Sequence, residues 1–239
     1  MMVVMSAMLD KPVPGLFITG TDTDVGKTYV TALVARDLRA AGYRVGVYKP
    51  VASGCVGEGC ERVSLDAQTL WLAAGRPGSL EAVCPQRFAA PLAPHLAARA
   101  EGCRIDPQLL RSGLDYWRPR SDVILVEGVG GLMCPLGEQE SVADLAYDFG
   151  FPLLVVTRNA LGTINHTRLT LIAARVFREG LPVAGLVLNN WPRQGEDPSR
   201  ATNREEMIAG CAPPLLAEVA SGGDRFDVAV DWFKLARAG

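Results

Sequence analysis

Short apolar runs alternate along this chain with longer segments in which apolar residues recur at helical spacing. The short runs are rich in Val, Ile and Leu, and their apolar positions do not alternate with polar ones. A run of roughly four to eight residues of this kind is typical of a β-strand covered on both faces of its sheet. We therefore predict strands at residues 16–19, 44–48, 122–127, 152–157 and 183–190.

The segments between these runs predict helices. Val30, Leu33, Val34 and Leu38 recur at helical spacing, and the Ala-Gly pair at 41–42 is a usual helix stop. Further helices are predicted at residues 65–74, 106–117, 141–149 and 163–178. A strand, a helix and a second strand within about 35 residues form a βαβ unit, which requires parallel strands and a right-handed crossover.

This order of elements predicts an α/β fold with a single doubly wound, mostly parallel sheet and helices on both faces. We assign residues 15–239 to one domain and residues 1–14 to an N-terminal extension. Residues 52–104 are richer in Gly, Pro and Cys, so we expect an insertion that overlies the ligand edge of the sheet. The tail after residue 220 is glycine-rich and then loosely helical.

Composition narrows the class of protein. The 239 residues include 24 Lys and Arg against 26 Asp and Glu, and these charges are dispersed. That balance gives no electrostatic reason to expect nucleic acid or an anionic membrane as a partner. No run approaches the roughly 20 apolar residues of a membrane helix, and no basic residue precedes the apolar start. We expect a cytoplasmic protein without a signal peptide.

The cysteines and histidines are not expected to carry chemistry. The six cysteines contain no Cys-x-x-Cys pair, and a chain of this length needs no disulfides to fold, so we expect reduced thiols. Zinc binding by Cys55 and Cys60 is disfavoured, because two thiols supply half of a tetrahedral set. His95 and His166 are interpreted as packing or hydrogen-bonding residues.

The segment GTDTDVGKT, residues 20–28, lies where the first predicted strand turns into the first predicted helix. Backbone N–H groups at such a turn converge on a phosphate, and a lysine reaches the outer phosphates. Gly26, Lys27 and Thr28 fit this arrangement, whereas the usual Gly-x4-Gly-Lys pattern would place glycine at Thr21. The alternative is a helix start at which Lys27 and Thr28 are merely solvated.

A phosphate loop that binds ATP also requires a metal site. The Thr28 hydroxyl is the first expected Mg²⁺ ligand, and carboxylates at other strand ends would complete the set. Glu127 follows a buried run and precedes three glycines in four residues, which points to the ligand edge. Asp66 begins a helical pattern, and its spacing alone favours an N-terminal cap over a metal ligand.

Three ordered segments, GTDTDVGKT, YKPVASG and VEGVGG, resemble those of the dethiobiotin synthetases, the ATP-dependent ligase family of biotin synthesis. The likeness continues through APHLAA, LGTINHT, VLNN and APPLLAE and so covers nearly the whole chain. It implies a P-loop NTPase-like fold and a homodimer with the substrate site at its interface. In the implied reaction CO₂ carboxylates one amine of 7,8-diaminopelargonate, ATP phosphorylates the carbamate, and the second amine closes a cyclic urea. Mg²⁺ is the implied cofactor and ATP a co-substrate.

The resemblance also implies roles for individual residues. Lys49 and Lys27 would be catalytic, and Thr28, Asp66 and Glu127 would hold Mg²⁺. The nucleotide would contact Thr23, Asp24, Val25, Gly26, Lys27, Thr28, Tyr29, Asp66, Glu127, Gly128, Gly130, Asn189, Asn190, Pro213 and Glu218. Of these, Asn189, Asn190, Pro213 and Glu218 would lie at the adenine. The substrate would contact Thr23 and Ser53 and, from across the interface, Leu161, Gly162, Thr163 and Asn165. Two lysines and a metal suit a step in which negative charge accumulates, and a helix N-terminus suits a carboxylate.

Some positions depart from the usual family residues. Asp24 stands where many members have Glu, Ala160 where some have Lys, and Ala217 and Ala220 where Gly and Pro are common.

Three other hypotheses stand beside the ligase. A partner-switching ATPase of the same broad class would carry a lysine at the position of Asp22. A cobyrinate-type amide synthetase couples a similar domain to a glutaminase domain, for which 239 residues leave no room on this chain. A catalytically silent nucleotide-binding module would not need Lys27, Thr28, Lys49 and Glu127 together.

Overall fold

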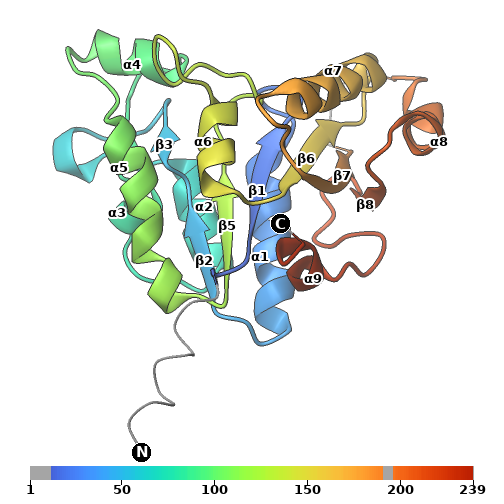
Figure 1. The fold of residues 1–239 in the computed structure, drawn as a ribbon, viewed down its shortest axis with the longest axis horizontal. Coiled ribbons are helices and arrows are strands. Elements are labelled where there is room, and N and C mark those ends of the chain that lie inside the picture. The colour runs from blue at the N-terminus through green and yellow to red at the C-terminus, as the bar shows by residue number, and fades with distance from the viewer. Residues whose placement is uncertain (1–11, 191–195, 239) are drawn as a thin grey trace, which may run out of the picture.

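The computed structural model describes residues 12–190 and 196–238, apart from the side chain of Cys60. Six strands form one sheet in the order β2-β5-β1-β6-β7-β8, and every pairing in it is parallel (Figure 1). The strands are β1 (Gly15–Gly20), β2 (Val45–Tyr48), β5 (Val123–Glu127), β6 (Leu153–Arg158), β7 (Val183–Asn189) and β8 (Leu215–Val219).

The five predicted strands are confirmed as β1, β2, β5, β6 and β7, with small differences at their ends. Leu16, Phe17 and Ile18 on β1 are fully buried on both sides of the sheet, which explains the absence of alternation in their run. β1 pairs with β5 on one side and β6 on the other, so the strand that leads into the phosphate loop lies at the centre of the sheet.

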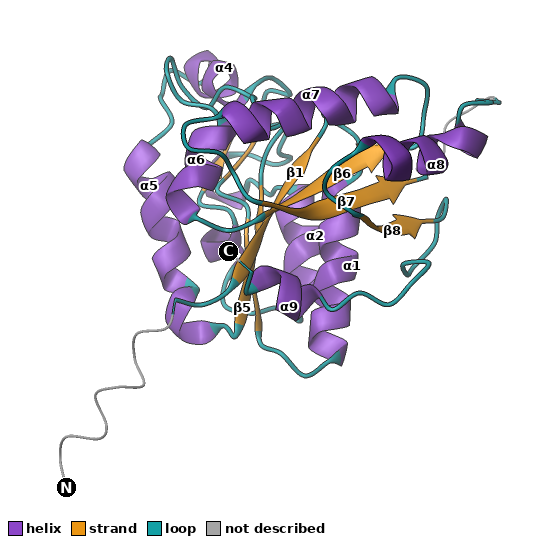
Figure 2. Ribbon diagram, turned by 45° about the vertical axis from the view of Figure 1, so that its right-hand side comes forward, coloured by secondary structure: helices purple, strands orange, loops and turns teal. Residues whose placement is uncertain are grey.

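Helices cover both faces of this sheet (Figure 2). On one face α1 (Lys27–Ala40) packs against α2 (Leu65–Ala73), and α1 also contacts α9 (Trp232–Ala236). On the other face lie α5 (Pro107–Ser112), α6 (Val142–Phe149) and α7 (Thr163–Val176), and α8 (Arg200–Gly210) packs beside α7. The carboxyl ends of all six strands therefore meet at one edge, between α4 (Pro94–Ala100) and α7.

The observed elements differ from the predicted ones in two respects. The predicted helix 106–117 is wrong as a single element: Asp106 caps α5, and a 3₁₀ turn at Gly113–Tyr116 follows it. A Cβ at Gly113 would lie 2.2 Å from the Tyr48 hydroxyl, so the chain passes too close to β2 for a larger residue there. β8 and α8 are additional elements that the apolar pattern did not indicate.

The segment 52–104 holds α2, α3 (Leu80–Val83), α4, a 3₁₀ turn at Gly59–Glu61 and a small parallel pair, β3 (Val51–Ala52) with β4 (Gln86–Arg87). A further 3₁₀ turn spans Arg118–Arg120. Most of the predicted N-terminal extension, residues 1–11, lies outside the described residues, as does the Cys60 side chain of the disfavoured zinc pair. Within the described ranges, no helix is both long enough and apolar enough to cross a membrane.

Candidate active site

The phosphate loop connects the end of β1 to the start of α1. Gly26 caps the helix in a left-handed conformation with φ of 91°, and a Cβ at this position would lie 2.0 Å from the Asn189 amide nitrogen. Any side chain at Gly26 would therefore displace Asn189, which donates a hydrogen bond to the Val25 carbonyl at 3.0 Å. Lys27 is buried, and its ammonium donates to the Asp22 carbonyl at 2.9 Å, so the loop is already folded around its lysine.

Four polar side chains from four elements converge beside this loop. Lys49, directly after β2, donates to a Glu127 oxygen at 2.5 Å and forms an ion pair with Asp66 at 2.9 Å. The Thr28 hydroxyl at the start of α1 donates to the same Glu127 oxygen at 2.8 Å. The parallel sheet brings Lys49 and Glu127 together, because Lys49 follows β2 and Glu127 ends β5 at the same edge.

Burial and neighbouring charge act in opposite directions on these groups. Burial lowers the pKa of Lys49, but the charges of Glu127 and Asp66 outweigh it and hold the pKa above its ordinary value. Burial would raise the pKa of Asp66, whereas the attraction of Lys49 leaves it below the ordinary value. The pKa of Lys27 is lowered, first by burial and then by the positive charge of Lys49. The site is thus arranged to hold Lys49 protonated.

Glu127 retains one unused oxygen. The residue has no exposed surface, and its Oε2 atom has no hydrogen-bond partner among the described residues. A buried carboxylate oxygen without a partner costs free energy unless a ligand completes it. With the Thr28 hydroxyl and the Asp66 carboxylate beside it, this oxygen belongs to a donor set of the kind that Mg²⁺ prefers.

The interpretation of Asp66 as a helix cap is wrong. Ser64 caps α2, because its hydroxyl accepts the Ala67 N–H at 3.2 Å. Asp66 is the second residue of α2, and its carboxylate forms an ion pair with Lys49 instead. A capping serine two residues earlier thus frees the aspartate for the site.

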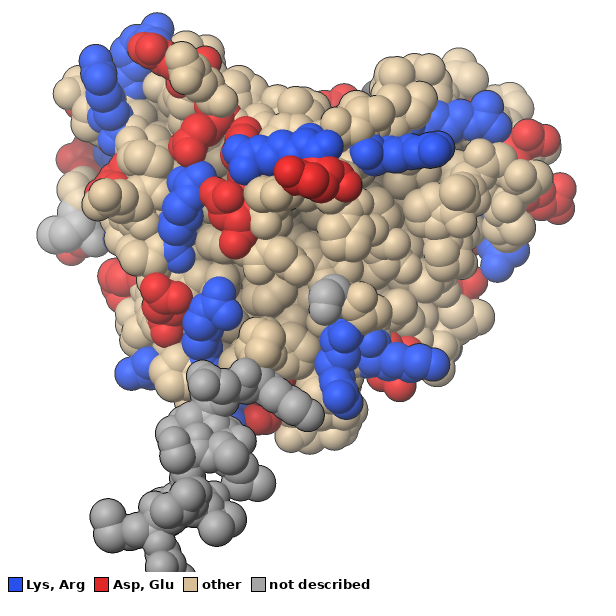
Figure 3. All heavy atoms as spheres, in the orientation of Figure 1, with Lys and Arg blue, Asp and Glu red and all other residues tan. Residues whose placement is uncertain are grey.

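A cleft of about 1010 Å³ opens above this cluster. Figure 3 shows that the surface of the molecule is indented at the edge between α4 and α7. The predicted residues that line the cleft are Thr23, Asp24, Gly26, Lys27, Thr28, Tyr29, Lys49, Ser53, Asp66 and Gly130. Residues 91–94 and Cys134 also line the cleft and were not predicted. Ala93 and Pro94 begin the segment APHLAA, which the sequence comparison had already singled out.

The two predicted glycines after β5 allow close approach. A Cβ at Gly128 would lie 2.9 Å from Val142, and one at Gly130, where φ is 63°, would lie 2.8 Å from the Cys134 sulfur. The backbone after Glu127 therefore turns under α6 without obstructing the cleft.

The residues predicted to bind the adenine fall into two groups. Asn190 donates to Glu218 at 2.6 Å and accepts from Asn159 at 2.7 Å, so these side chains form one polar network at the ends of β6, β7 and β8. Asn189 faces the phosphate loop. Pro213 is not brought to this edge: it precedes β8, so roughly 20 Å of strand separates it from the carboxyl end of β8. The run after Pro213 forms β8, a strand that the apolar pattern did not indicate.

The predicted carboxylate site lies at the start of α7. Gly162 precedes the helix with φ of 93°, and Leu161 is 82% exposed. Its backbone N–H donates to the Asp197 carboxylate at 2.9 Å, while Asn165 is exposed and Thr163 is buried. These four residues lie outside the large cleft.

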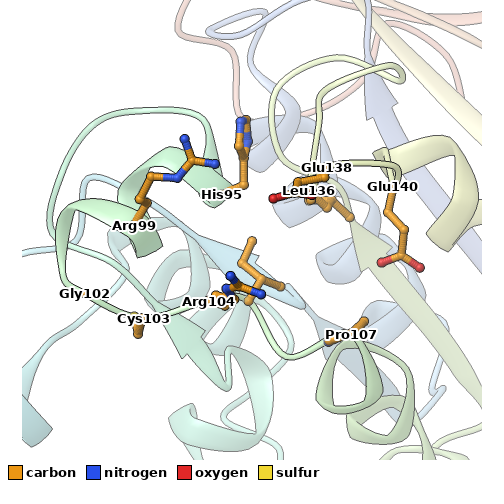
Figure 4. A pocket seen from close by; sticks show the side chains of 11 residues that line it. His95, Arg99, Gly102, Cys103, Arg104, Pro107, Leu136, Glu138 and Glu140 are labelled. Atoms are coloured by element: carbon orange, nitrogen blue, oxygen red, sulfur yellow. The ribbon is translucent and has the colours of Figure 1, made fainter.

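A second cavity of about 550 Å³ lies between α4 and the segment 136–140 (Figure 4). His95 lines it and donates a hydrogen bond from Nδ1 to the Pro135 carbonyl at 3.2 Å. His166 lines a much smaller space beside Thr163. Neither histidine lines the large cleft, which agrees with leaving both out of the chemistry.

Comparison with known proteins adds to this geometry. A family model described as an AAA domain matches residues 14–220. The chain is 44% identical over 214 residues to a protein of Rhodopirellula baltica named ATP-dependent dethiobiotin synthetase, covering 85% of this chain and 82% of that protein. Proteins of the same name from Anaeromyxobacter dehalogenans strain 2CP-C and Akkermansia muciniphila are 47% and 36% identical, covering 81% and 89% of this chain and 83% and 95% of theirs.

Among solved structures, the chain is similar to the signal recognition particle receptor FtsY of Elizabethkingia anophelis, with a TM-score of 0.50 and 13% identity. The match covers 95% of this chain and 65% of the receptor chain. At this identity the likeness shows the fold alone. It confirms the predicted fold class, an α/β domain of P-loop NTPase type.

Proposed function

Because this chain belongs to the dethiobiotin synthetase family, we propose that it forms dethiobiotin from 7,8-diaminopelargonate, CO₂ and ATP by the carbamate route described above. The observation that carries the proposal is the convergence of Lys27, Lys49, Thr28 and Asp66 at one cleft, with the buried Glu127 in contact with Lys49 and Thr28. Two ammonium groups and a carboxylate pair in a partly buried site suit phosphoryl transfer to an anionic acceptor.

Each step has balanced chemistry and a group to support it. A neutral amine attacks CO₂ and loses a proton, giving a carbamate. A carbamate oxygen then attacks the γ-phosphorus of ATP, and ADP leaves. The second amine attacks the carbonyl carbon and loses a proton, phosphate departs, and a cyclic urea remains. Lys49 stays protonated, so it stabilises the negative charge on the carbamate and the transferring phosphoryl group.

Lys27 and the backbone of residues 23–28 would hold the phosphates of ATP. Lys27 reaches its own loop carbonyl at Asp22 and is surrounded by loop backbone, which is the arrangement that P-loops use to receive phosphate oxygens. The diamine would then lie in the cleft, beside Thr23 of this loop and Ser53.

Mg²⁺ fits the donors that the chain supplies. Thr28, Asp66 and Glu127 offer one hydroxyl and two carboxylates within hydrogen-bond reach of one another, and the unpartnered Glu127 Oε2 supports their assignment. When bound, the metal would neutralise charge on the ATP phosphates. Lys49 must then exchange its carboxylate contacts for contacts with the reacting groups.

The adenine would lie beside Asn189, Asn190 and Glu218, which face the ligand edge at the ends of β7 and β8. Pro213 is omitted from this set because it lies at the opposite end of β8.

We also propose a homodimer in which α7 faces its partner. Leu169, Ile172 and Val176 are 55%, 58% and 69% exposed and recur at spacings of three and four residues along α7. An apolar stripe of this kind indicates a protein interface. It begins one turn after the loop 161–165, so a partner bound there would bring that loop toward the second active site. Since ATP is its co-substrate, we propose that the protein is located in the cytoplasm.

The alternatives find less support. Asp22 accepts the Thr23 N–H at 2.7 Å with its side chain, so this position serves the fold of the loop rather than presenting the lysine of a partner-switching ATPase. A silent module would have no use for the buried ion pair of Lys49 with Glu127.

The test is phosphate release from Mg-ATP and bicarbonate, with and without 7,8-diaminopelargonate, with the product identified by mass. Diamine-dependent release with formation of the cyclic urea is expected. Release that ignores the diamine, or none at all, would contradict the proposal. Glu127→Gln should weaken the Mg²⁺ dependence of turnover, while Glu138→Gln, an exposed control outside the cleft, should leave it unchanged.

A further inference from the structure

Four threonine hydroxyls, three of them on buried residues, form a cluster that the reaction above does not use. Thr157, at the end of β6, has no exposed surface, and its hydroxyl oxygen lies 2.6 Å from that of Thr163, 3.1 Å from that of Thr167 and 3.3 Å from that of Thr21. Thr163 and Thr167 belong to the first turns of α7, whereas Thr21 begins the phosphate loop. The cluster thus joins two elements that the sequence separates by more than a hundred residues.

The hydrogen-bond capacity of Thr157 is completely used. A hydroxyl accepts two hydrogen bonds and donates one. Thr21 and Thr167 both donate to Thr157, so its own hydrogen is directed to Thr163. A substitution that removes this one oxygen therefore leaves two buried hydroxyls, those of Thr163 and Thr167, and the partly buried hydroxyl of Thr21 without their partner at once.

Thr21 is also the residue that departs from the usual phosphate-loop pattern, where glycine would stand. Glycine at this position would supply no hydroxyl to the cluster. The side chain that departs from the pattern is therefore the one that bonds to Thr157.

The two ends of the cluster are not equally well fixed. The phosphate loop has other supports, because Thr21 donates its backbone N–H to Val156 and Asn189 holds Val25. The start of α7 has no side-chain cap, since Gly162 stands at the capping position. Hydrogen bonds from the Leu161 N–H to Asp197 and from Asn203 to the Ala160 carbonyl tie it to the segment 197–203 and not to the phosphate loop. Loss of the cluster should accordingly displace α7 relative to the phosphate loop and leave the ATP site in place.

We propose that Thr157 is a positioning residue that sets the start of α7 against the phosphate loop, and so places the loop 161–165 for the substrate carboxylate that it would bind across the dimer interface. This inference rests on the proposed function, because that loop is taken to bind 7,8-diaminopelargonate. Thr157 acts through Thr163 and Thr167 and does not itself touch substrate.

The test compares Thr157→Val, which keeps the branched shape, with Thr157→Ser, which keeps the hydroxyl. The valine variant should raise KM for the diamine roughly tenfold, the equivalent of 1.4 kcal/mol, while KM for ATP changes less than about twofold. Serine should restore most of the loss. Thr21→Val should raise the same KM by a smaller factor, because its hydrogen bond is the longest of the three.

The matched control is Thr170→Val, in the same helix. Thr170 is buried, and its hydroxyl donates to the His166 carbonyl at 2.9 Å and not to a hydroxyl of the cluster. It should leave both KM values unchanged. Thermal unfolding of each variant separates a positioning effect from loss of fold.

A wild-type KM for the diamine in folded Thr157→Val, or equal rises in both KM values, would overturn the inference. A wild-type enzyme without diamine-dependent turnover would instead overturn the proposed function, and this appears before any variant is made.

Discussion

Lys49→Met tests the buried charge cluster most directly. The Lys49 and Glu127 side chains are 3% and 0% exposed, so the substitution leaves a buried carboxylate without its cation. At 2.5 Å and an effective dielectric constant of about 20, the attraction between them is about 7 kcal/mol. Desolvation of each ion offsets part of this, and removal of one partner from a buried pair typically costs about 3–5 kcal/mol.

The loss is large against a total stability of about 5–15 kcal/mol. We expect urea unfolding to give a free energy of unfolding lower by about 3–5 kcal/mol for Lys49→Met, with ATP binding nearly intact and turnover abolished. Adding Glu127→Gln should recover much of the stability, because the uncompensated charge is then gone, but none of the turnover.

Lys234→Met is the matched control. Lys234 is exposed on α9, so the same chemical change should alter the free energy of unfolding by less than about 0.5 kcal/mol. A loss below about 1 kcal/mol for Lys49→Met, or no recovery in the double variant, would refute the assignment of Lys49 as the counter-charge of Glu127. Unchanged turnover would remove Lys49 from the mechanism.

Three further predictions concern separate features. Lys49 lowers the folded-state pKa of Asp66, so the stability advantage of the wild type over Asp66→Asn should be present above the unfolded-state pKa and be lost as pH falls through the folded value, measured by urea unfolding between pH 7 and pH 3. Ile172→Glu, on the exposed stripe of α7, should convert the dimer to monomer in light scattering. Burial raises the pKa of Cys84 to about 12, so at pH 8 a thiol reagent should modify the exposed Cys103 and reach Cys84 only after unfolding.

Each of these has a contrary outcome. Equal stabilities of the wild type and Asp66→Asn at pH 7 would show that Asp66 gains nothing from its lysine. A variant dimer as tight as the wild type would remove α7 from the interface. Rapid modification of the buried thiol in the native protein would show that the insertion opens more readily than its packing indicates.

The catalytic edge could be predicted because its residues follow strand ends. Lys49 and Glu127 each stand directly after or at the end of an apolar run, and parallel strands bring such positions together without knowledge of side-chain packing. Residue types at Gly26, Lys27 and Thr28 then fixed the chemistry. These signals are local in sequence and indicated Lys27, Thr28 and Glu127, whereas the roles predicted for Lys49 and Asp66 came from the resemblance to the dethiobiotin synthetases.

Contacts that depend on strand order were not accessible in this way. Thr21 meets Thr157 only because β6 lies beside β1, and no feature of either segment indicates that neighbour. The same holds for the network around Asn190, which joins the ends of three strands. The strand after Pro213 was missed because its short run follows two prolines, which favour a loop.

The position of β1 at the centre of the sheet has a consequence for how the chain acquires its fold. β2 follows β1 along the chain but does not pair with it; β5 lies between them, and Ile18 pairs with Glu127. During synthesis both edges of β1 therefore wait for strands made more than a hundred residues later. Such long-range parallel pairing is slow, and unpaired strand edges are prone to aggregate. A chain interrupted before β5 would carry the complete phosphate loop and yet have no sheet on which to hold it.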